Sequence, residues 1–243
     1  MRKVLHAEWT KARTVRSTTL TPLVMALLTP ALAVFVGLTG SLHPTDSVFA
    51  GSLTGSVPAQ ITAGIFGVLV VSGEYGTRMI DVTFAACPRR GRVLLAKALL
   101  AAAVTFVIGL ASCAAAYGLG TLLLADRPQG EPMPALAGVA LCFAAATLLG
   151  LALGALLRHS AGAITAVIGL MLVPSLFGPL FGDLQRWITG AAPPAPLQKL
   201  IGISDASAAA TGSLGGWPSL ALLLAYSLLA LAAAVLVVRR RDA

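Results

Sequence analysis

The chain has 243 residues, of which 57% are hydrophobic and only 11% are charged, and its mean hydropathy is +0.89. In a soluble domain of this length roughly a quarter of the residues are charged. The composition therefore excludes a soluble globular protein and indicates an integral membrane protein. The net charge of +8 does not indicate nucleic-acid binding, because the basic residues flank apolar segments and form no basic domain of their own.

Residues 2–18 form a basic, amphipathic start to the chain. Apolar residues recur at helical spacing and basic residues occupy the remaining surface, which predicts a helix lying in the headgroup layer of a membrane. Glu8 and the lack of a small-x-small cleavage site disfavour a cleaved signal peptide. The residues predicted to anchor this helix at the membrane surface are Trp9, Lys11, Arg13 and Arg16.

Six apolar segments follow, and each is predicted to be a transmembrane helix. Their ranges are about 20–39, 57–73, 93–125, 135–157, 161–181 and 217–238. The third exceeds one untilted span, so we expect it to project beyond the hydrocarbon or to bend near Gly118 and Gly120. The proline-rich segment 182–216 is only partly polar and is predicted to lie against the outer membrane face. Residues 1–243 are therefore predicted to form one all-α transmembrane domain.

The lysines and arginines predict the orientation of the chain. With both termini in the cytoplasm, fourteen of the seventeen basic residues lie on the inner side, and only Arg127, Arg186 and Lys199 lie outside. Basic residues are enriched in cytoplasmic loops. This asymmetry predicts a multi-pass protein of the plasma membrane with both ends inside the cell.

Apart from Lys97 at the inner edge of the third, the apolar segments contain essentially no charged residue, which argues against ion coupling by this chain itself. The three histidines and three cysteines form no metal-ligand spacing or disulfide framework. Small-x-x-x-small spacings such as Gly150 to Gly154 and Gly178 to Gly182 are expected by chance in a chain so rich in alanine and glycine. No nucleotide-binding motif of the G-x-x-x-x-G-K-[ST] type is present. We therefore expect no catalytic residue, metal or cofactor on this chain, and any energy for transport must come from another polypeptide.

Residues 74–92 are the long polar segment between the second and third apolar segments. Residues 77–86 are predicted to form about three helical turns, ended by Pro88, with Ile80 and Phe84 on one apolar face. A short helix of this kind fits a socket on a cytosolic partner, and it equally fits a position on the membrane surface. The arginines predicted to contact lipid phosphates here are Arg89, Arg90 and Arg92.

With these elements, the chain resembles the permease subunits of ABC-2 type ABC transporters. The resemblance covers nearly the whole chain. It rests on the basic start around Glu8-Trp9-Thr10-Lys11 and Arg13, on the turn Glu74-Tyr75-Gly76-Thr77, and on Pro88-Arg89-Arg90-Gly91-Arg92 followed by Lys97. The six helices and the hydrophobic external segment before the sixth also match.

The resemblance implies a complex of two permease chains, expected to be a homodimer, with two cytosolic ATPase subunits that hold ATP and Mg²⁺. It implies that residues 2–18 are an interfacial elbow helix and that the first, second and fifth helices line the path. It also implies that residues 77–86 are the coupling helix. The residues predicted to dock on the ATPase are Thr77, Arg78, Met79, Ile80, Asp81, Val82 and Phe84.

Glu74 is predicted to be a charge at the inner mouth that pairs with Arg78 or with a neighbouring helix and moves as the loop is pushed. The alternative is a solvated acid at a helix end. The expected function is ATP-driven export of an apolar or amphipathic solute, such as a drug, lipid or peptide antibiotic. Two alternatives stay open: a non-transporting membrane immunity or assembly factor, and a carrier that works without ATP.

Overall fold

The computed structural model describes residues 10, 16–43, 46–76, 79, 90–124, 128–130, 132–203 and 207–241. All regular secondary structure in these ranges is helical, and six of the helices are long and apolar enough to cross a membrane. This confirms the predicted all-α architecture with six candidate spans. The chain therefore has the build of a multi-pass membrane protein.

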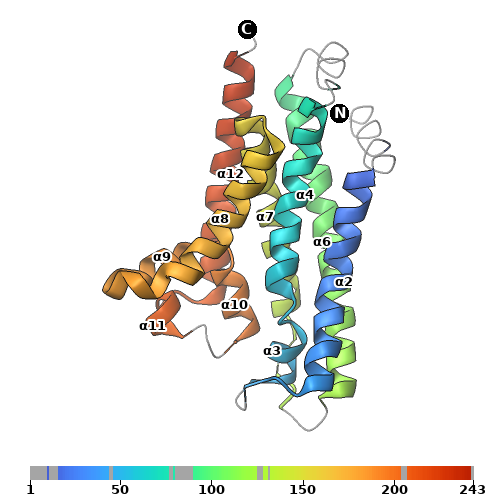
Figure 1. Cartoon of the computed structure of the whole chain (residues 1–243), viewed down its shortest axis with the longest axis vertical. Coiled ribbons are helices and arrows are strands. Elements are labelled where there is room, and N and C mark those ends of the chain that lie inside the picture. Colours follow the sequence, from blue (N-terminus) through green and yellow to red (C-terminus); the bar gives the residue numbers. More distant parts are fainter. Residues whose placement is uncertain are drawn as a thin grey trace.

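The long helices form one elongated bundle (Figure 1). They are α2 (Arg16–Thr39), α4 (Ser56–Gly76), α6 (Arg90–Leu123), α7 (Ala135–Leu157), α8 (Ser160–Phe177) and α12 (Gly216–Arg241). Helix α2 begins, and α12 ends, at the same end of the bundle, which we call the terminus end. Helix α4 ends there, α6 begins there, and α7 turns there into α8. The predicted polar loop thus joins two helices at the terminus end.

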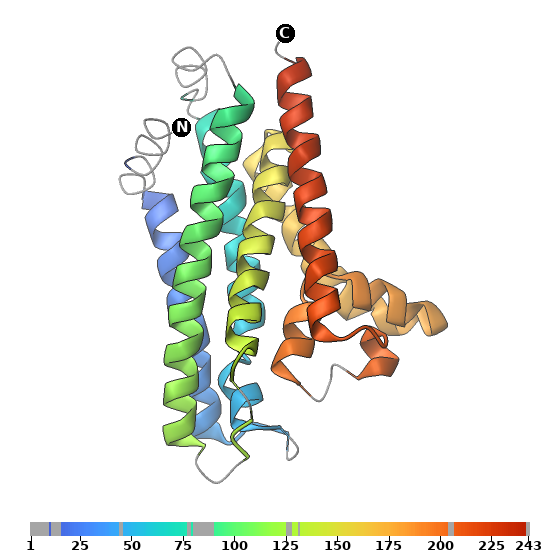
Figure 2. The ribbon, with the colours of Figure 1, turned by 180° about the vertical axis from the view of Figure 1, so that it is seen from behind.

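Helix α7 lies at the centre of the bundle, between α4, α6 and α12 (Figure 2). Its approach to α4 depends on glycines, because a Cβ atom on Gly67 would overlap the carbonyl oxygen of Thr147, and one on Gly150 would overlap that of Gly64. Helices in lipid associate through such small residues, which allow close backbone contact. The spacing of Gly150 and Gly154 was expected by chance from the composition, but in the structure both glycines lie at the contact between α4 and α7.

A buried hydroxyl group joins three helices near the middle of the bundle. The Thr147 hydroxyl of α7 lies 3.0 Å from the carbonyl oxygen of Ala63 in α4 and 3.1 Å from the hydroxyl of Thr105 in α6. Both threonine side chains are fully buried. Because an unpaired polar group costs several kcal/mol in lipid, these contacts favour one register of the three helices.

Helix α6 is continuous through Gly118 and Gly120, so the long third segment does not break there. At about 1.5 Å per residue its 34 residues span about 51 Å, well beyond the ~30 Å of hydrocarbon. The far end packs against the short helix α3 (Val48–Ser52), where the rings of Phe49 and Tyr117 lie 5.8 Å apart in an edge-to-face arrangement. The projecting end of α6 is therefore supported by protein.

Several helix boundaries differ from the prediction; for example, α6 begins at Arg90 instead of residue 93, and α12 ends at Arg241 instead of residue 238. Helix α2 begins by Arg16 instead of near residue 20, so Pro22 lies inside it and not in its first turn. Helix α4 continues through Glu74 to Gly76, beyond the expected residue 73. The fifth segment, expected to be helical to residue 181, is α-helical only to Phe177. Beyond it Pro179 and the positive φ of Gly182 interrupt the regular hydrogen bonding.

The segment between α8 and α12 forms a sideways projection from the bundle (Figures 1 and 2). It comprises η1 (Gly178–Leu184), α9 (Gln185–Ala191), α10 (Ala195–Ile201) and α11 (Ala208–Thr211). The buried Gln60 of α4 donates a hydrogen bond to the carbonyl oxygen of Pro193, at 2.9 Å. Lys199 donates to the carbonyl oxygen of Leu214 at 2.8 Å and to the hydroxyl of Ser219 in α12 at 3.3 Å, and partial burial lowers the pKa of its ammonium group. These contacts tie the inner part of the projection to the bundle.

Candidate functional site at the base of the polar loop

A buried ion pair lies where the polar loop leaves the bundle. The ammonium group of Lys97 in α6 lies 2.7 Å from a carboxylate oxygen of Glu74 in α4. The side chains are only 3% and 11% exposed, respectively. Glu74 stands two residues before the end of α4, and Lys97 stands two turns into α6. The pair therefore connects the helices on either side of residues 77–89.

Buried apolar residues lie within about one helical turn of both members of this pair. On α4 the preceding turn carries the buried Val71, and on α6 the residues Leu94, Ala98 and Ala101 face the same cluster. Burying two charges costs several kcal/mol per ion, and close geometry with hydrogen bonding offsets that cost. Removing one member of a buried pair is typically costly for this reason. Breaking the pair would therefore be costly, and this fixes α4 and α6 in their observed arrangement. Its net contribution to stability is nevertheless small compared with that of apolar residues of similar size at the same positions.

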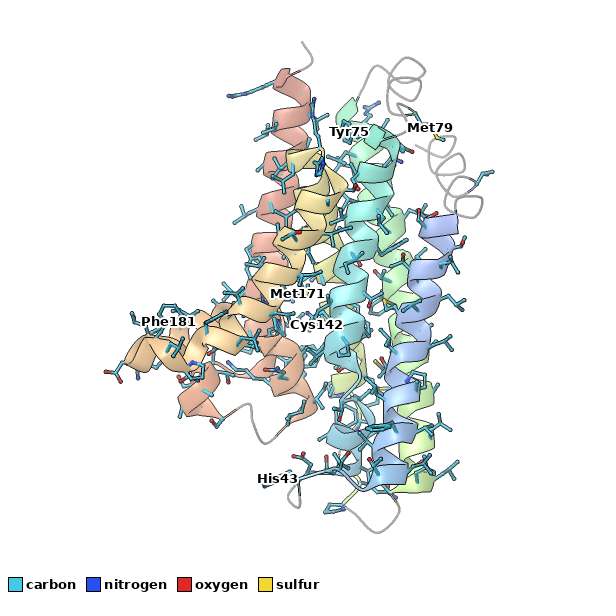
Figure 3. The ribbon with its side chains drawn as sticks, in the orientation of Figure 1. His43, Tyr75, Met79, Cys142, Met171 and Phe181 are labelled. Carbon is cyan, nitrogen blue, oxygen red and sulfur yellow. The ribbon has the colours of Figure 1, made fainter. Side chains whose placement is uncertain are left out.

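The neighbouring residue of α4 makes a second charged contact, toward the turn between α7 and α8. The guanidinium carbon of Arg158 lies 5.4 Å from the centroid of the Tyr75 ring, which is a cation–π distance. Figure 3 shows Tyr75 at the terminus end, near the top of α4. Consecutive residues of α4, Glu74 and Tyr75, therefore contact two different parts of the bundle.

Arg158 and His159 build the tight turn itself. Arg158 has a φ of 54°, the one positive φ at a non-glycine residue in the described ranges, and its N–H closes α7 by donating to the carbonyl oxygen of Gly154. His159 caps α8, since its Nδ1 accepts a hydrogen bond from the N–H of Gly162 at 3.2 Å. A left-handed conformation costs an arginine about 1–2 kcal/mol relative to ordinary helical geometry. Its side chain is therefore a good candidate for a role beyond the turn.

The arrangement is suited to mechanical transmission. Displacing the end of α4 must move or break its contacts with α6, through Lys97, and with the α7–α8 turn, through Arg158. No group of three or more potential metal ligands occurs among the described residues. The contacts of α4 with α6 and with the α7–α8 turn suit the site to a conformational role.

Most residues of the predicted coupling helix lie outside the described ranges. These are Thr77, Arg78, Ile80, Asp81, Val82 and Phe84, whereas Met79 is described, helical and 38% exposed (Figure 3). The predicted surface anchors Trp9, Lys11, Arg13 and Arg89 are also outside. Arg16 and Arg90 lie at the first positions of α2 and α6, and Arg92 is exposed in the first turn of α6.

The structure shows the predicted pairing of Glu74 with a neighbouring helix, while its movement with the loop stays a prediction. Its carboxylate is buried and bound to Lys97 of a neighbouring helix, so it is not a solvated acid at a helix end. Neither Lys97 nor Arg158 was among the predicted site residues. Lys97 could have been found from the sequence, because a lone lysine in a long apolar segment requires an acidic partner.

No known protein family matches the chain, and neither does any curated protein.

Proposed function

We propose that the chain is the permease subunit of an ABC-2 type exporter and that it works as a homodimer with two cytosolic ATPase subunits. The observation that carries the proposal is the Glu74–Lys97 ion pair at the base of the polar loop. It supplies a rigid connection between the loop and the bundle, which a permease driven from outside requires. The six apolar helices and the polar loop pattern also support it.

In this proposal the terminus end faces the cytoplasm and the projection faces outward, in the cell membrane. The basis is the distribution of basic residues, fourteen of which belong to the terminus side of the sequence. Residues 77–86 then lie where a cytosolic ATPase can reach them. The cargo is an apolar or amphipathic solute. Among the described residues of the spans the one ion pair lies at the terminus end, so the rest of the helix surfaces offers few charges to a polar solute.

The proposed mechanism begins with pressure on the loop. When the ATPase subunits close, they push residues 77–86 toward the membrane and displace the end of α4. Glu74 transmits this displacement to α6 through Lys97, and Tyr75 transmits it to the α7–α8 turn through Arg158. Helix α8, of whose apolar window only 17% is buried, changes its tilt, and the cavity between the two permease chains changes from inward-facing to outward-facing.

Replacing Ile80 and Phe84 together by aspartate is expected to abolish ATPase association while membrane insertion continues. Charges in an apolar socket cost several kcal/mol each, so recovery of the ATPase should fall by at least about tenfold. The measurement is affinity purification of the tagged chain from native membranes, followed by identification of the bound ATPase.

The matched control for this experiment is Ile80→Leu with Phe84→Leu, which keeps the face apolar and should retain the ATPase. Equal recovery with the aspartate variant would mean that residues 77–86 lie on the membrane and bind no ATPase. Failure of the unmodified chain to recover any ATPase would overturn the proposed function as a whole.

A further inference from the structure

The side chain of Gln60 connects α4 to the projection. Gln60 stands one turn into α4 and is fully buried, and its Nε2 donates to the carbonyl oxygen of Pro193 at 2.9 Å. Pro193 is itself buried, in the short connection between α9 and α10. Lys199 of α10 is bound differently, since it donates to Leu214 and to Ser219 at the start of α12. The Gln60 contact thus joins the projection to the end of α4 that lies away from the polar loop.

The carbonyl oxygen of the same amide is left unused. The Oε1 atom of Gln60 is buried and accepts no hydrogen bond from any residue that the structure describes. A buried acceptor without a partner costs free energy that an apolar side chain of the same size would not cost. Packing alone therefore disfavours a glutamine here. The property that sets Gln60 apart from an apolar residue is the bond that its Nε2 makes to the projection.

Helix α4 connects this contact with the Glu74–Lys97 ion pair. It runs without a break from Gln60 to Glu74 (Figure 1), a length of about 21 Å at about 1.5 Å per residue. Its glycines on this path are enclosed, because a Cβ atom on Gly64 would come 2.7 Å from Val167 of α8 and one on Gly67 would overlap the backbone of α7. The neighbouring helices therefore oppose bending at these two positions. A displacement at one end of α4 is expected to reach the other end.

We infer that Gln60 is a positioning residue that couples the projection to the Glu74–Lys97 pair through α4. Movement of the end of α4 at the polar loop passes along the helix, and the Gln60 amide applies it to the connection between α9 and α10. The part of this coupling in transport rests on the proposed function. The coupling itself is a free energy shared between two sites, and it is a property of the chain without any partner.

A double-mutant cycle followed by hydrogen exchange tests this coupling in the purified full-length chain. Lys97→Met breaks the ion pair at one end of α4, and Gln60→Met removes the amide at the other. Mass spectrometry follows the backbone amides of α9 and α10, and the amides of α2 serve as the reference for global opening. With Gln60 present, Lys97→Met should raise exchange in α9 and α10 at least about fivefold more than in α2. In the Gln60→Met variant, the same substitution should raise it less than about twofold more than in α2.

Gln198→Met is the matched control, because Gln198 is half-buried in α10 and undergoes the same chemical change. It should leave the response to Lys97→Met intact. An equal response with and without Gln60 would show that Gln60 only supports the fold and would overturn the inference. Loss of the response in Gln198→Met, or no response with Gln60 present, would overturn it as well.

Two features of the design keep its outcome independent of folding and of the proposed function. If Gln60→Met with Lys97→Met gives no monodisperse protein, the neutral pair Glu74→Gln with Lys97→Met replaces Lys97→Met throughout the cycle. No ATPase is present in the experiment, so its result does not depend on whether the chain binds one. A failure of the coupling is thereby distinguished from a failure of the ATPase to associate.

Discussion

Replacing Lys97 by methionine is expected to destabilise the protein by about 3–5 kcal/mol, the typical cost of removing one member of a buried ion pair. The Glu74 carboxylate would stay in the apolar environment between α4 and α6, where its counter-ion is 2.7 Å away in the native protein. Thermal unfolding in detergent, followed by size-exclusion chromatography, measures the loss. A decrease below about 1 kcal/mol would show that the pair is accessible to water and is not a structural connection.

The double variant Glu74→Gln with Lys97→Met is the control that separates stability from transmission. Two neutral residues of similar size should recover most of the lost stability, since replacing both members of a buried pair is often neutral or stabilising. If the pair transmits movement, this stable variant should still fail to couple ATP binding to the bundle. Equal coupling in the double variant and the unmodified chain would remove the proposed role of Glu74.

Coupling can be measured with spin labels on cysteines at positions 73 and 162 of the complex with its ATPase. Both glycines are exposed, and a Cβ atom at either position meets no close contact. The pair reports the distance between the end of α4 and the start of α8. We expect this distance to change on adding a non-hydrolysable ATP analogue to the unmodified complex, and to stay constant in the neutral double variant.

Replacing Gly150 by alanine is expected to destabilise the protein by about 1–3 kcal/mol, the typical cost of inserting a methylene group into a packed interface. The added methyl group would overlap the backbone carbonyl of Gly64, which cannot rotate away as a side chain can. Helices α4 and α7 would have to separate, and the contact between Thr147 and Ala63 would lengthen. Unfolding in detergent measures the effect.

Gly118→Ala is the matched control for this substitution. Gly118 is exposed on α6, and a Cβ atom there meets nothing within 4 Å. The same chemical change should therefore leave stability unchanged or raise it by up to about 1 kcal/mol, because alanine is the better helix former. Equal effects at both positions would show that helix propensity, and not the close approach of α4 and α7, decides the result.

The number and approximate limits of the spans could be predicted because they follow from local properties. Whether a segment crosses a membrane depends on the length and hydrophobicity of consecutive residues, and proline and glycine mark where it ends. The polar loop was equally recognisable, as an interruption between two apolar segments. Its predicted coupling helix, residues 77–86, lies almost wholly outside the described ranges and stays a prediction.

The contacts that make up the candidate site depend on which helices lie side by side. Glu74 and Lys97 are 23 residues apart, Tyr75 and Arg158 are 83 apart, and each pair forms only because α4 packs against both α6 and α7. Hydrophobicity cannot choose among such packings, because lipid is as apolar as the helix faces and rewards none of them. Steric fit at Gly67 and Gly150 and the pairing of buried charges make that choice. These are properties of surfaces that meet only in the folded bundle.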